Sequence, residues 1–212
     1  MLTSTLQYLS RWILPLLLLG PVAKGIAADD VIERPQVRAG DSWTYRQTSL
    51  ITRNSGDFSY RVTGVGADRI KTVSDGFSDL YTTDWNLIES SAGIKIAPHE
   101  GYFQFPLEPG KTYAFKSERT VARMRTPWEG TVTVADWETI DVPAGRFRAL
   151  RVDINGSFGH GPPARRARLQ LSYWWSTDVK RWVRYDLWMS KPASKATDFN
   201  TRTELVQYAP AS

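Results

Sequence analysis

Side chains suited to catalysis are sparse in this sequence. It contains no cysteine, which excludes a thiol nucleophile and a thiolate metal site. His99 and His160 are the two histidines, and they lie far apart without the spacing of metal ligands. No glycine-rich phosphate loop or dinucleotide fingerprint is present, so we expect no cofactor and no metal. A Ser/His/Asp triad can still assemble from distant residues, which leaves an unrecognised hydrolase as one hypothesis.

Two pairs of carboxylates could do acid–base chemistry. Asp136 and Glu138 lie two positions apart on a predicted strand and therefore share a face. Asp75 and Asp79 form a second pair near a predicted turn. A glycosidase needs two carboxyl groups at a defined separation in a deep cleft. The alternative is that these groups are solvent-facing, and the sequence favours it because no cleft is indicated.

The densest aromatic cluster is residues 172–188, which hold four of the nine tryptophans. The period of two predicts a hairpin with one apolar face, formed by Leu169, Leu171, Tyr173, Trp175, Val183, Tyr185, Leu187 and Met189. Trp174, Trp182 and Trp188 fall on the faces that also carry Arg184 and Asp186. These three tryptophans either stabilise the hairpin by cross-strand contacts or form a wet-edged aromatic surface that binds a ligand or a partner.

Two long loops could add to such a surface. The first, residues 97–110, contributes Tyr102, Phe103 and Phe105 as candidate ligand-binding residues. The second, residues 157–168, ends in Arg165, Arg166 and Arg168, which we interpret as a rim for anionic groups or, alternatively, as a solvated face. The whole chain has 27 basic and 22 acidic residues, so the charge balance does not indicate a nucleic-acid-binding surface.

The elements that position these residues are predicted to be β-strands. Alternating segments rich in aromatic and β-branched residues recur between glycine, proline and asparagine turns. Pro143 and Gly145 form one such turn, to which we assign a structural role because proline fixes φ and glycine tolerates positive φ. We expect an all-β domain: an antiparallel curved sheet, half-barrel or sandwich of about ten strands, judged from the usual strand spacing.

A weak internal repeat accompanies the strand pattern. An offset of 70 residues aligns the segment that starts at Gly40 with the one that starts at Gly110, and each is a glycine turn followed by an aromatic-alternating strand. Two tandem related β-units within one sheet would explain it, although β-rich chains in general look alike at this level.

The N-terminal segment reads as an export signal. Residues 1–27 contain a basic start, a short apolar run and small residues before Asp29, which is the order of a secretory signal peptide. The apolar run is too short to span a bilayer, and no later run is longer. We expect residues 1–27 to be a signal-peptide helix and residues 28–212 to be one exported domain with no integral membrane segment.

The sequence also resembles a group of known proteins. Residues 137–152, with their Val-Pro-Ala-Gly-Arg-Phe turn, and the strand that starts Tyr173-Trp-Trp are similar to TapB-like and related uncharacterised bacterial periplasmic proteins. The resemblance implies a Gram-negative periplasmic location. Arg181 departs from the pattern, since glycine often ends the hairpin turn there. By looser analogy, such curved sheets resemble half-barrel carriers of acyl chains, a likeness of fold alone.

These observations rank three hypotheses. The first is a non-enzymatic periplasmic β-domain that binds an apolar ligand, a lipid or acyl chain, on a curved aromatic-lined sheet. The second is an accessory or scaffold protein that uses the same surface to bind an envelope protein. The third is the hydrolase. The oligomeric state is not indicated by the sequence.

Overall fold

The computed structural model describes residues 30–162, 166–190 and 197–212. The predicted signal peptide, residues 1–27, lies outside these ranges. The described part of the chain forms twelve β-strands and the 3-10 helix η3 (Thr177–Val179). The strands are β1 (Ser42–Ser49), β2 (Ser55–Val65), β3 (Arg69–Ser74), β4 (Phe77–Thr82), β5 (Leu87–Ser90), β6 (Ile94–Ala97), β7 (Thr112–Val121), β8 (Met124–Val142), β9 (Gly145–Phe158), β10 (Ala167–Ser176), β11 (Arg181–Ser190) and β12 (Thr197–Ala209).

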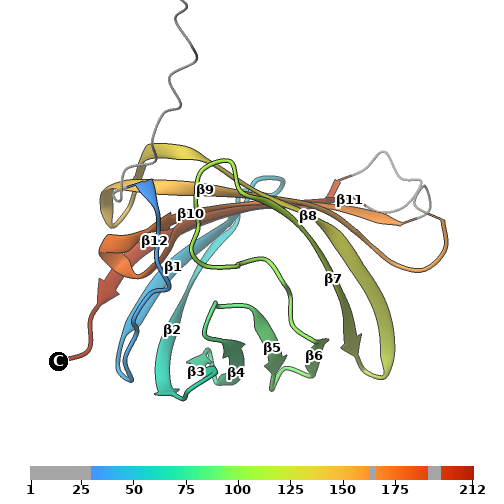
Figure 1. Ribbon diagram of the computed structural model, residues 1–212, viewed down its shortest axis with the longest axis horizontal. Helices are drawn as coiled ribbons and strands as arrows, with labels where there is room; N and C mark the ends of the chain where they lie inside the picture. Colours follow the sequence, from blue (N-terminus) through green and yellow to red (C-terminus); the bar gives the residue numbers. More distant parts are fainter. Residues whose placement is uncertain (1–29, 163–165, 191–196) are drawn as a thin grey trace, which may run out of the picture.

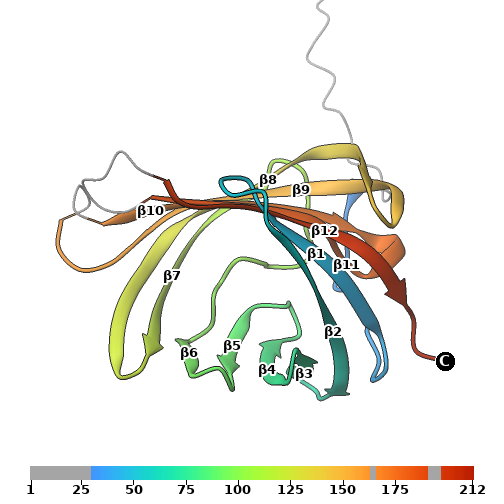
Figure 2. The same ribbon diagram turned by 180° about the vertical axis from the view of Figure 1, so that it is seen from behind.

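The strands form a closed antiparallel barrel. Each strand pairs with its neighbour in sequence, and β1 pairs with β12 to close the sheet. The long strands β7–β12 make a broad curved wall, and the short strands β3–β6 lie across from it (Figures 1 and 2). The prediction of an all-β antiparallel fold is confirmed. The half-barrel or sandwich of about ten strands is wrong.

Two physical reasons explain that error. Alternation within a strand shows which side chains share a face, but it does not specify the partner of the strand. The pairing of β1 with β12 therefore could not be predicted from the sequence. In addition, β5 and β6 have four residues each, which is too short for a period of two to stand out.

Alternation does determine what fills the barrel. On β9, Leu150, Val152 and Ile154 are fully buried, while Arg151 and Asp153 between them face outward and pair with each other. On β1, Trp43 and Tyr45 are likewise fully buried. The apolar half of each strand therefore forms a core inside the barrel, and the polar half forms its outer surface.

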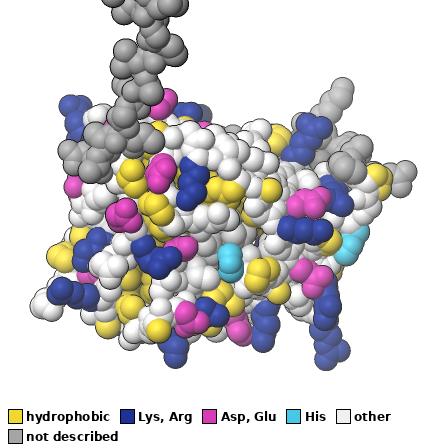
Figure 3. Space-filling model, in the orientation of Figure 1, with side chains coloured by type: hydrophobic (Ala, Val, Ile, Leu, Met, Phe, Trp, Pro, Cys, Tyr) yellow, Lys and Arg dark blue, Asp and Glu magenta, His cyan; other side chains and the backbone are white. Residues whose placement is uncertain are grey.

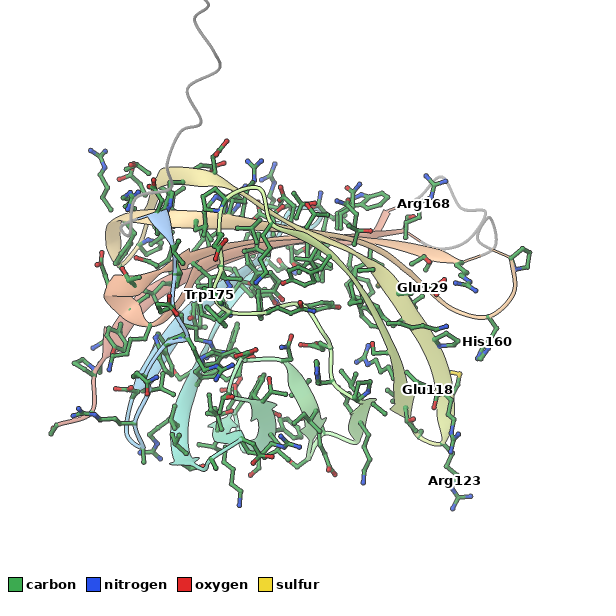
Figure 4. All side chains as sticks on the ribbon, in the orientation of Figure 1. Glu118, Arg123, Glu129, His160, Arg168 and Trp175 are labelled. Atoms are coloured by element: carbon green, nitrogen blue, oxygen red, sulfur yellow. The ribbon has the colours of Figure 1, made fainter. Side chains whose placement is uncertain are left out.

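A segment without regular structure enters the barrel between β6 and β7. Both views show residues 98–111 passing inside the curved wall (Figures 1 and 2). Asn86 holds this segment, because its side-chain amide bonds both the carbonyl oxygen and the N–H of Phe103, at 2.8 and 2.9 Å. Farther along, Leu107 forms a β-bridge with Ile32. The segment fills one end of the barrel, the end that also holds Trp175 (Figure 4).

A pair of glycines permits close packing on β8 and β9. Gly130 lies opposite Gly156 across the two strands, and Phe115 lies opposite Gly130 from β7. A Cβ on Gly130 would stand 2.3 Å from the Asn155 carbonyl oxygen and 2.8 Å from the ring of Phe115. The Phe115 ring thus covers a stretch of bare backbone, which only glycine provides.

The predicted repeat has a counterpart in local structure. Gly40 and Gly110 both have positive φ, and their N–H groups donate to the carbonyl oxygens of Val62 and Val134, each at 2.8 Å. The strands that follow, β1 and β7, start with the same contacts to the next strand. Both segments belong to the one barrel.

No helix among the described residues has the length and apolar character needed to cross a membrane.

A candidate ligand cavity inside the barrel

The inner faces of β10 and β11 form a ladder of paired side chains along the barrel. Trp175 lies opposite Trp182, Tyr173 opposite Tyr185, Leu171 opposite Leu187, and Leu169 opposite Met189. Met189 in turn lies opposite Phe199 on β12, which is half exposed. The ladder changes from indole to phenol to aliphatic side chains as it approaches Phe199. One end of the barrel is therefore aromatic and filled, and the other is aliphatic.

A cavity of about 400 Å³ occupies the aliphatic end. The aliphatic side chains of its wall come from β5, β6, β10 and β11, and they are Leu87, Ile94, Ile96, Leu169, Leu171, Leu187 and Met189. The lining is completed by the aromatic residues Tyr102, Trp128, Tyr173, Tyr185 and Phe199 and by the polar residues Glu100, Ser117 and Arg119. Sites for small molecules have volumes of roughly 300–1,000 Å³ and are mostly apolar with a few polar groups, so this cavity has the size and character of such a site.

A second cavity of about 160 Å³ lies deeper, on the aromatic side. Its wall includes Tyr60, Tyr81, Trp85, Arg181 and Trp182. The two cavities adjoin, because they share Leu87, Glu100, Tyr173 and Tyr185 as lining residues. Burial raises the pKa of Tyr60 to about 12, so its hydroxyl stays protonated and can donate a hydrogen bond. The interior as a whole is an apolar chamber with a polar inner end.

Arg181 is the most unusual residue of this inner end. Its side chain is only 3% exposed, and its guanidinium lies 4.1 Å from the Tyr60 ring centroid and 4.5 Å from that of Trp85. Trp43, Tyr45 and Trp182 also surround it within 6 Å. Its Nε and Nη1 atoms have no hydrogen-bond partner, and no carboxylate of the described residues forms an ion pair with it.

Glu100 lies at the junction of the two cavities. Its carboxylate accepts a hydrogen bond from the Leu87 N–H at 3.2 Å. Burial raises its pKa to about 7, although that hydrogen bond and the charge of Arg119 act in the opposite direction. Burial also raises the pKa of Asp79, which accepts from the Tyr81 hydroxyl nearby. Burial thus favours the neutral form of both carboxyl groups.

The three predicted tryptophans lie in different environments. Trp174 is on the outer face but is only 7% exposed, because Glu138 and Arg184 cover it. Its Nε1 donates to Glu138 Oε2 at 2.8 Å, and Arg184 lies over its ring at 4.4 Å. Trp188 pairs with Gln170 on the outer face and is partly exposed. Trp182, which alternation places with these two, is buried inside the barrel, where it stacks on Tyr45 at 3.9 Å.

A β-bulge explains the position of Trp182. The register of β10 with β11 shifts between Trp174 and Trp175, so that Trp174 lies opposite Arg184 but Trp175 lies opposite Trp182. Val183 is the extra residue, and it reverses the alternation beyond it. A single continuous aromatic surface made of Trp174, Trp182 and Trp188 therefore does not form.

The predicted loop residues are divided in a similar way. Tyr102 and Phe103 are each 3% exposed and belong to the interior, where Tyr102 lines the large cavity and Phe103 the small one. Phe105 is partly buried against Trp175, with ring centroids 5.2 Å apart. The loop thus contributes to the walls of the interior cavities instead of presenting its aromatics on the sheet's surface.

The predicted rim and turn residues lie elsewhere. Arg166 forms an ion pair with Glu129, and Arg168 is exposed at the far end from Trp175 (Figure 4). Arg165 falls outside the described residues. Pro143 occupies the two-residue turn between β8 and β9, and Gly145 follows it with φ of 134°. On the face shown in Figure 3, basic and acidic side chains are interspersed.

The candidate catalytic groups make ordinary structural contacts. His160 Nε2 donates to the Arg125 carbonyl oxygen at 2.7 Å, and His160 lies on the hairpin at the end opposite Trp175 (Figure 4). Burial lowers the pKa of His99. Glu138 pairs with Arg151 on the outer surface. Over the described ranges, no group of three or more metal-binding side chains occurs.

Sequence reasoning missed Arg181 and Glu100 as interior residues. Arg181 follows a predicted turn and resembles an ordinary surface residue there. Lys180 takes the left-handed conformation of that turn, with φ of 57°, so the position after it is free to begin the strand and point inward. Glu100 sits in an apparent loop. The aromatic residues around both positions are the one signal that could have indicated a buried environment.

Comparisons with known proteins support the fold. No family model matches the sequence, and no curated protein matches it significantly. Among solved structures, one described as a "putative lipoprotein" from Parabacteroides distasonis has a TM-score of 0.53 and 12% sequence identity; the match covers 84% of this chain and 97% of that one. The hypothetical lipoprotein YmcC from Escherichia coli has a TM-score of 0.50 and 9% identity, over 81% and 86% of the two chains. At these identities the likeness is one of fold.

Proposed function

We propose that this protein is an exported, non-enzymatic β-barrel that holds an apolar ligand, a lipid or acyl chain, inside the barrel. The cavity of about 400 Å³ with its aliphatic wall is the observation that carries the proposal. A fully collapsed core would leave no such space, since protein interiors pack about as densely as organic crystals. The site differs from the surface predicted from sequence: Trp182, Tyr102 and Phe103 contribute from inside, and Trp174 does not contribute.

Export, with a periplasmic location, is part of the same proposal. It rests on the signal-like residues 1–27 and on the resemblance to periplasmic proteins. Two structures of similar fold are described as lipoproteins, which are exported proteins. The given sequence has no cysteine to carry a lipid of that kind.

The docking alternative has less support. It needs Trp174, Trp182 and Trp188 together on a surface, but Trp174 is covered and Trp182 is inside the barrel. The hydrolase alternative has no supporting contact at His99 or His160 among the described residues.

The first test is native mass spectrometry of the protein purified gently from the periplasm, with solvent extraction of any adduct. We expect a reproducible apolar adduct. A second measurement uses the neutral fluorescent probe N-phenyl-1-naphthylamine. Leu171→Trp, which fills the cavity, should abolish probe binding, whereas Gln170→Trp, one position away on the outer face, should leave it unchanged. A clean apo mass together with no probe binding by the wild type would overturn the proposal.

A further inference from the structure

Arg181 is a buried cation whose hydrogen-bonding capacity is incompletely used. Burying a charge without a partner is costly, and natural proteins almost always pair such groups. The five surrounding rings offset part of this cost through cation–π contacts. A ring does not replace a hydrogen-bond acceptor, and Nε and Nη1 have no acceptor among the described residues. The Nε1 of Trp85, which lines the same cavity, also lacks an acceptor.

The interior acids do not complete this site. Neither Asp79 nor Glu100 forms an ion pair with Arg181, and burial favours the neutral form of both. The small cavity is lined by Arg181, by the Trp85 indole and by Tyr60, together with Glu100, which forms no ion pair with the guanidinium and whose pKa burial raises to about 7. A bound anion would supply both the missing acceptors and the missing charge.

The anion has to carry an apolar chain, because the small cavity adjoins the large one. The ladder from Tyr173 and Tyr185 through Leu171 and Leu187 to Met189 and Phe199 provides an aliphatic path away from Arg181. One guanidinium balances one negative charge. A carboxylate carries a single charge, whereas a phosphate monoester carries between one and two near neutral pH.

We propose that the ligand is a long-chain carboxylate of the fatty-acid class, with its head group on Arg181 and its hydrocarbon chain in the aliphatic cavity. This inference rests on the proposed function, since it names the chemistry of the ligand held in the same site. Arg119, which lines the large cavity, also has a buried Nε without a partner, but the residue is partly exposed, whereas Arg181 is 3% exposed and has two such nitrogen atoms.

The test compares two ligands with the same chain and different head groups, palmitate and 1-hexadecanol, by displacement of N-phenyl-1-naphthylamine. The wild type should bind palmitate at least about tenfold more tightly, as expected for a charge-assisted hydrogen bond in a buried site. Arg181→Met should bind both ligands equally and keep the probe. Arg181→Lys, which retains the charge, should keep part of the preference and serves as the fallback if the Met variant does not fold.

Two controls locate the head group. Arg168→Met changes an exposed arginine on the outer face of β10 and should retain the preference for palmitate. Arg119→Met changes the wall of the large cavity and with it both affinities, but their ratio should still favour palmitate. If the preference disappears with Arg119→Met and survives Arg181→Met, the head group lies at the aliphatic end and the inference is wrong. Equal binding of both ligands by the wild type overturns the inference but leaves the proposed function standing; binding of neither, with no probe binding, overturns both.

Discussion

At the scale of single residues, Glu100 is the clearest case of a side chain in conflict with its surroundings. Its pKa of about 7, against an ordinary value of 4.5, means that the folded protein holds this proton more tightly than the unfolded chain does. Between these two pKa values the unfolded chain binds fewer protons than the folded one, so stability falls as pH rises. The contribution is fully present below pH 4.5 and is lost as pH passes 7.

We therefore predict that Glu100→Gln changes the free energy of unfolding more favourably at pH 8 than at pH 4.5. The difference should reach up to about 3 kcal/mol. The measurement is urea unfolding at several pH values. Comparing the two pH profiles separates the effect of Glu100 from the groups coupled to it, which are Asp79, Arg119, Tyr81, Tyr102, Tyr173 and Tyr185. Glu89→Gln, at an exposed position on β5, is the control and should show no such trend. Parallel pH profiles for the wild type and Glu100→Gln would contradict the assignment.

Gly130 carries the second prediction at this scale. An alanine there would bring its Cβ to 2.3 Å from the Asn155 carbonyl oxygen and 2.7 Å from Gly156 Cα, both of which are backbone atoms. Because backbone cannot rotate away, β8 and β9 have to separate. We expect Gly130→Ala to lower the free energy of unfolding by about 2–3 kcal/mol, measured by urea denaturation. Gly64→Ala on β2, where a Cβ meets nothing within 4 Å, should leave the free energy of unfolding nearly unchanged. If both variants lost the same stability, the close contact at Gly130 would not be the cause of the loss.

At the scale of elements, the outer face of β8–β11 has its own polar network. Glu138 accepts from Trp174 and pairs with Arg151, Arg151 pairs with Asp153, and Arg184 pairs with Asp186 while covering Trp174. Trp174 is thus a structural residue that links neighbouring strands from outside. The same hairpin lines the cavity from inside with Tyr173 and Trp182.

Trp174→Phe should therefore affect stability and leave ligand binding intact. The change removes the hydrogen bond to Glu138 and weakens the contact with Arg184, for a loss of about 1–2 kcal/mol. Trp182→Phe, on the inner face, should instead alter the fluorescence of bound N-phenyl-1-naphthylamine. Thermal unfolding and probe titration of both variants separate the two roles. Impaired probe binding by a folded Trp174→Phe would place this tryptophan in the site after all.

The same hairpin shows what sequence could and could not predict. Alternation correctly placed Leu169, Leu171 and Tyr173 on the inner face, because a period of two is imposed by the strand itself. It failed at Trp182, because a bulge depends on how two strands pair, and the pattern within a single strand does not specify that pairing. Arg181 directly follows the turn at Lys180, where a charged residue is usually exposed, so its interior position was not predicted.

At the scale of the whole molecule, closure makes the cavity. An open curved sheet would expose the aliphatic side chains of β10 and β11 to water, whereas pairing of β1 with β12 encloses them opposite β5 and β6. One end is filled by Trp43, Trp175 and the segment that contains Phe103, and the aliphatic cavity lies toward the other. A ligand bound as proposed would enter from the end near Phe199 and stop at Arg181.

Asp41 forms hydrogen bonds across the β1/β12 pairing that closes the barrel. This residue is fully buried just before β1, and its carboxylate accepts from the N–H of Arg38 at 2.9 Å and from that of Ala211, beyond β12, at 2.8 Å. Lys180, from the turn between β10 and β11, reaches the same carboxylate at 3.5 Å. One side chain thus ties together the two strands of the closing seam and the turn that precedes Arg181.

We predict that Asp41→Ala loosens the seam before the rest of the barrel. Removing the carboxylate leaves two N–H groups and an ammonium without their acceptor, which should cost about 3 kcal/mol or more. Amide hydrogen exchange should speed up in β1 and β12 more than in β8 and β9, and palmitate binding should weaken because the turn before Arg181 loses its tether. Asp57→Ala, which breaks an exposed pair with Arg46 on the outside, should change stability little. Uniform acceleration of exchange across all strands would mean that the barrel opens as one unit and that Asp41 does not control its closure.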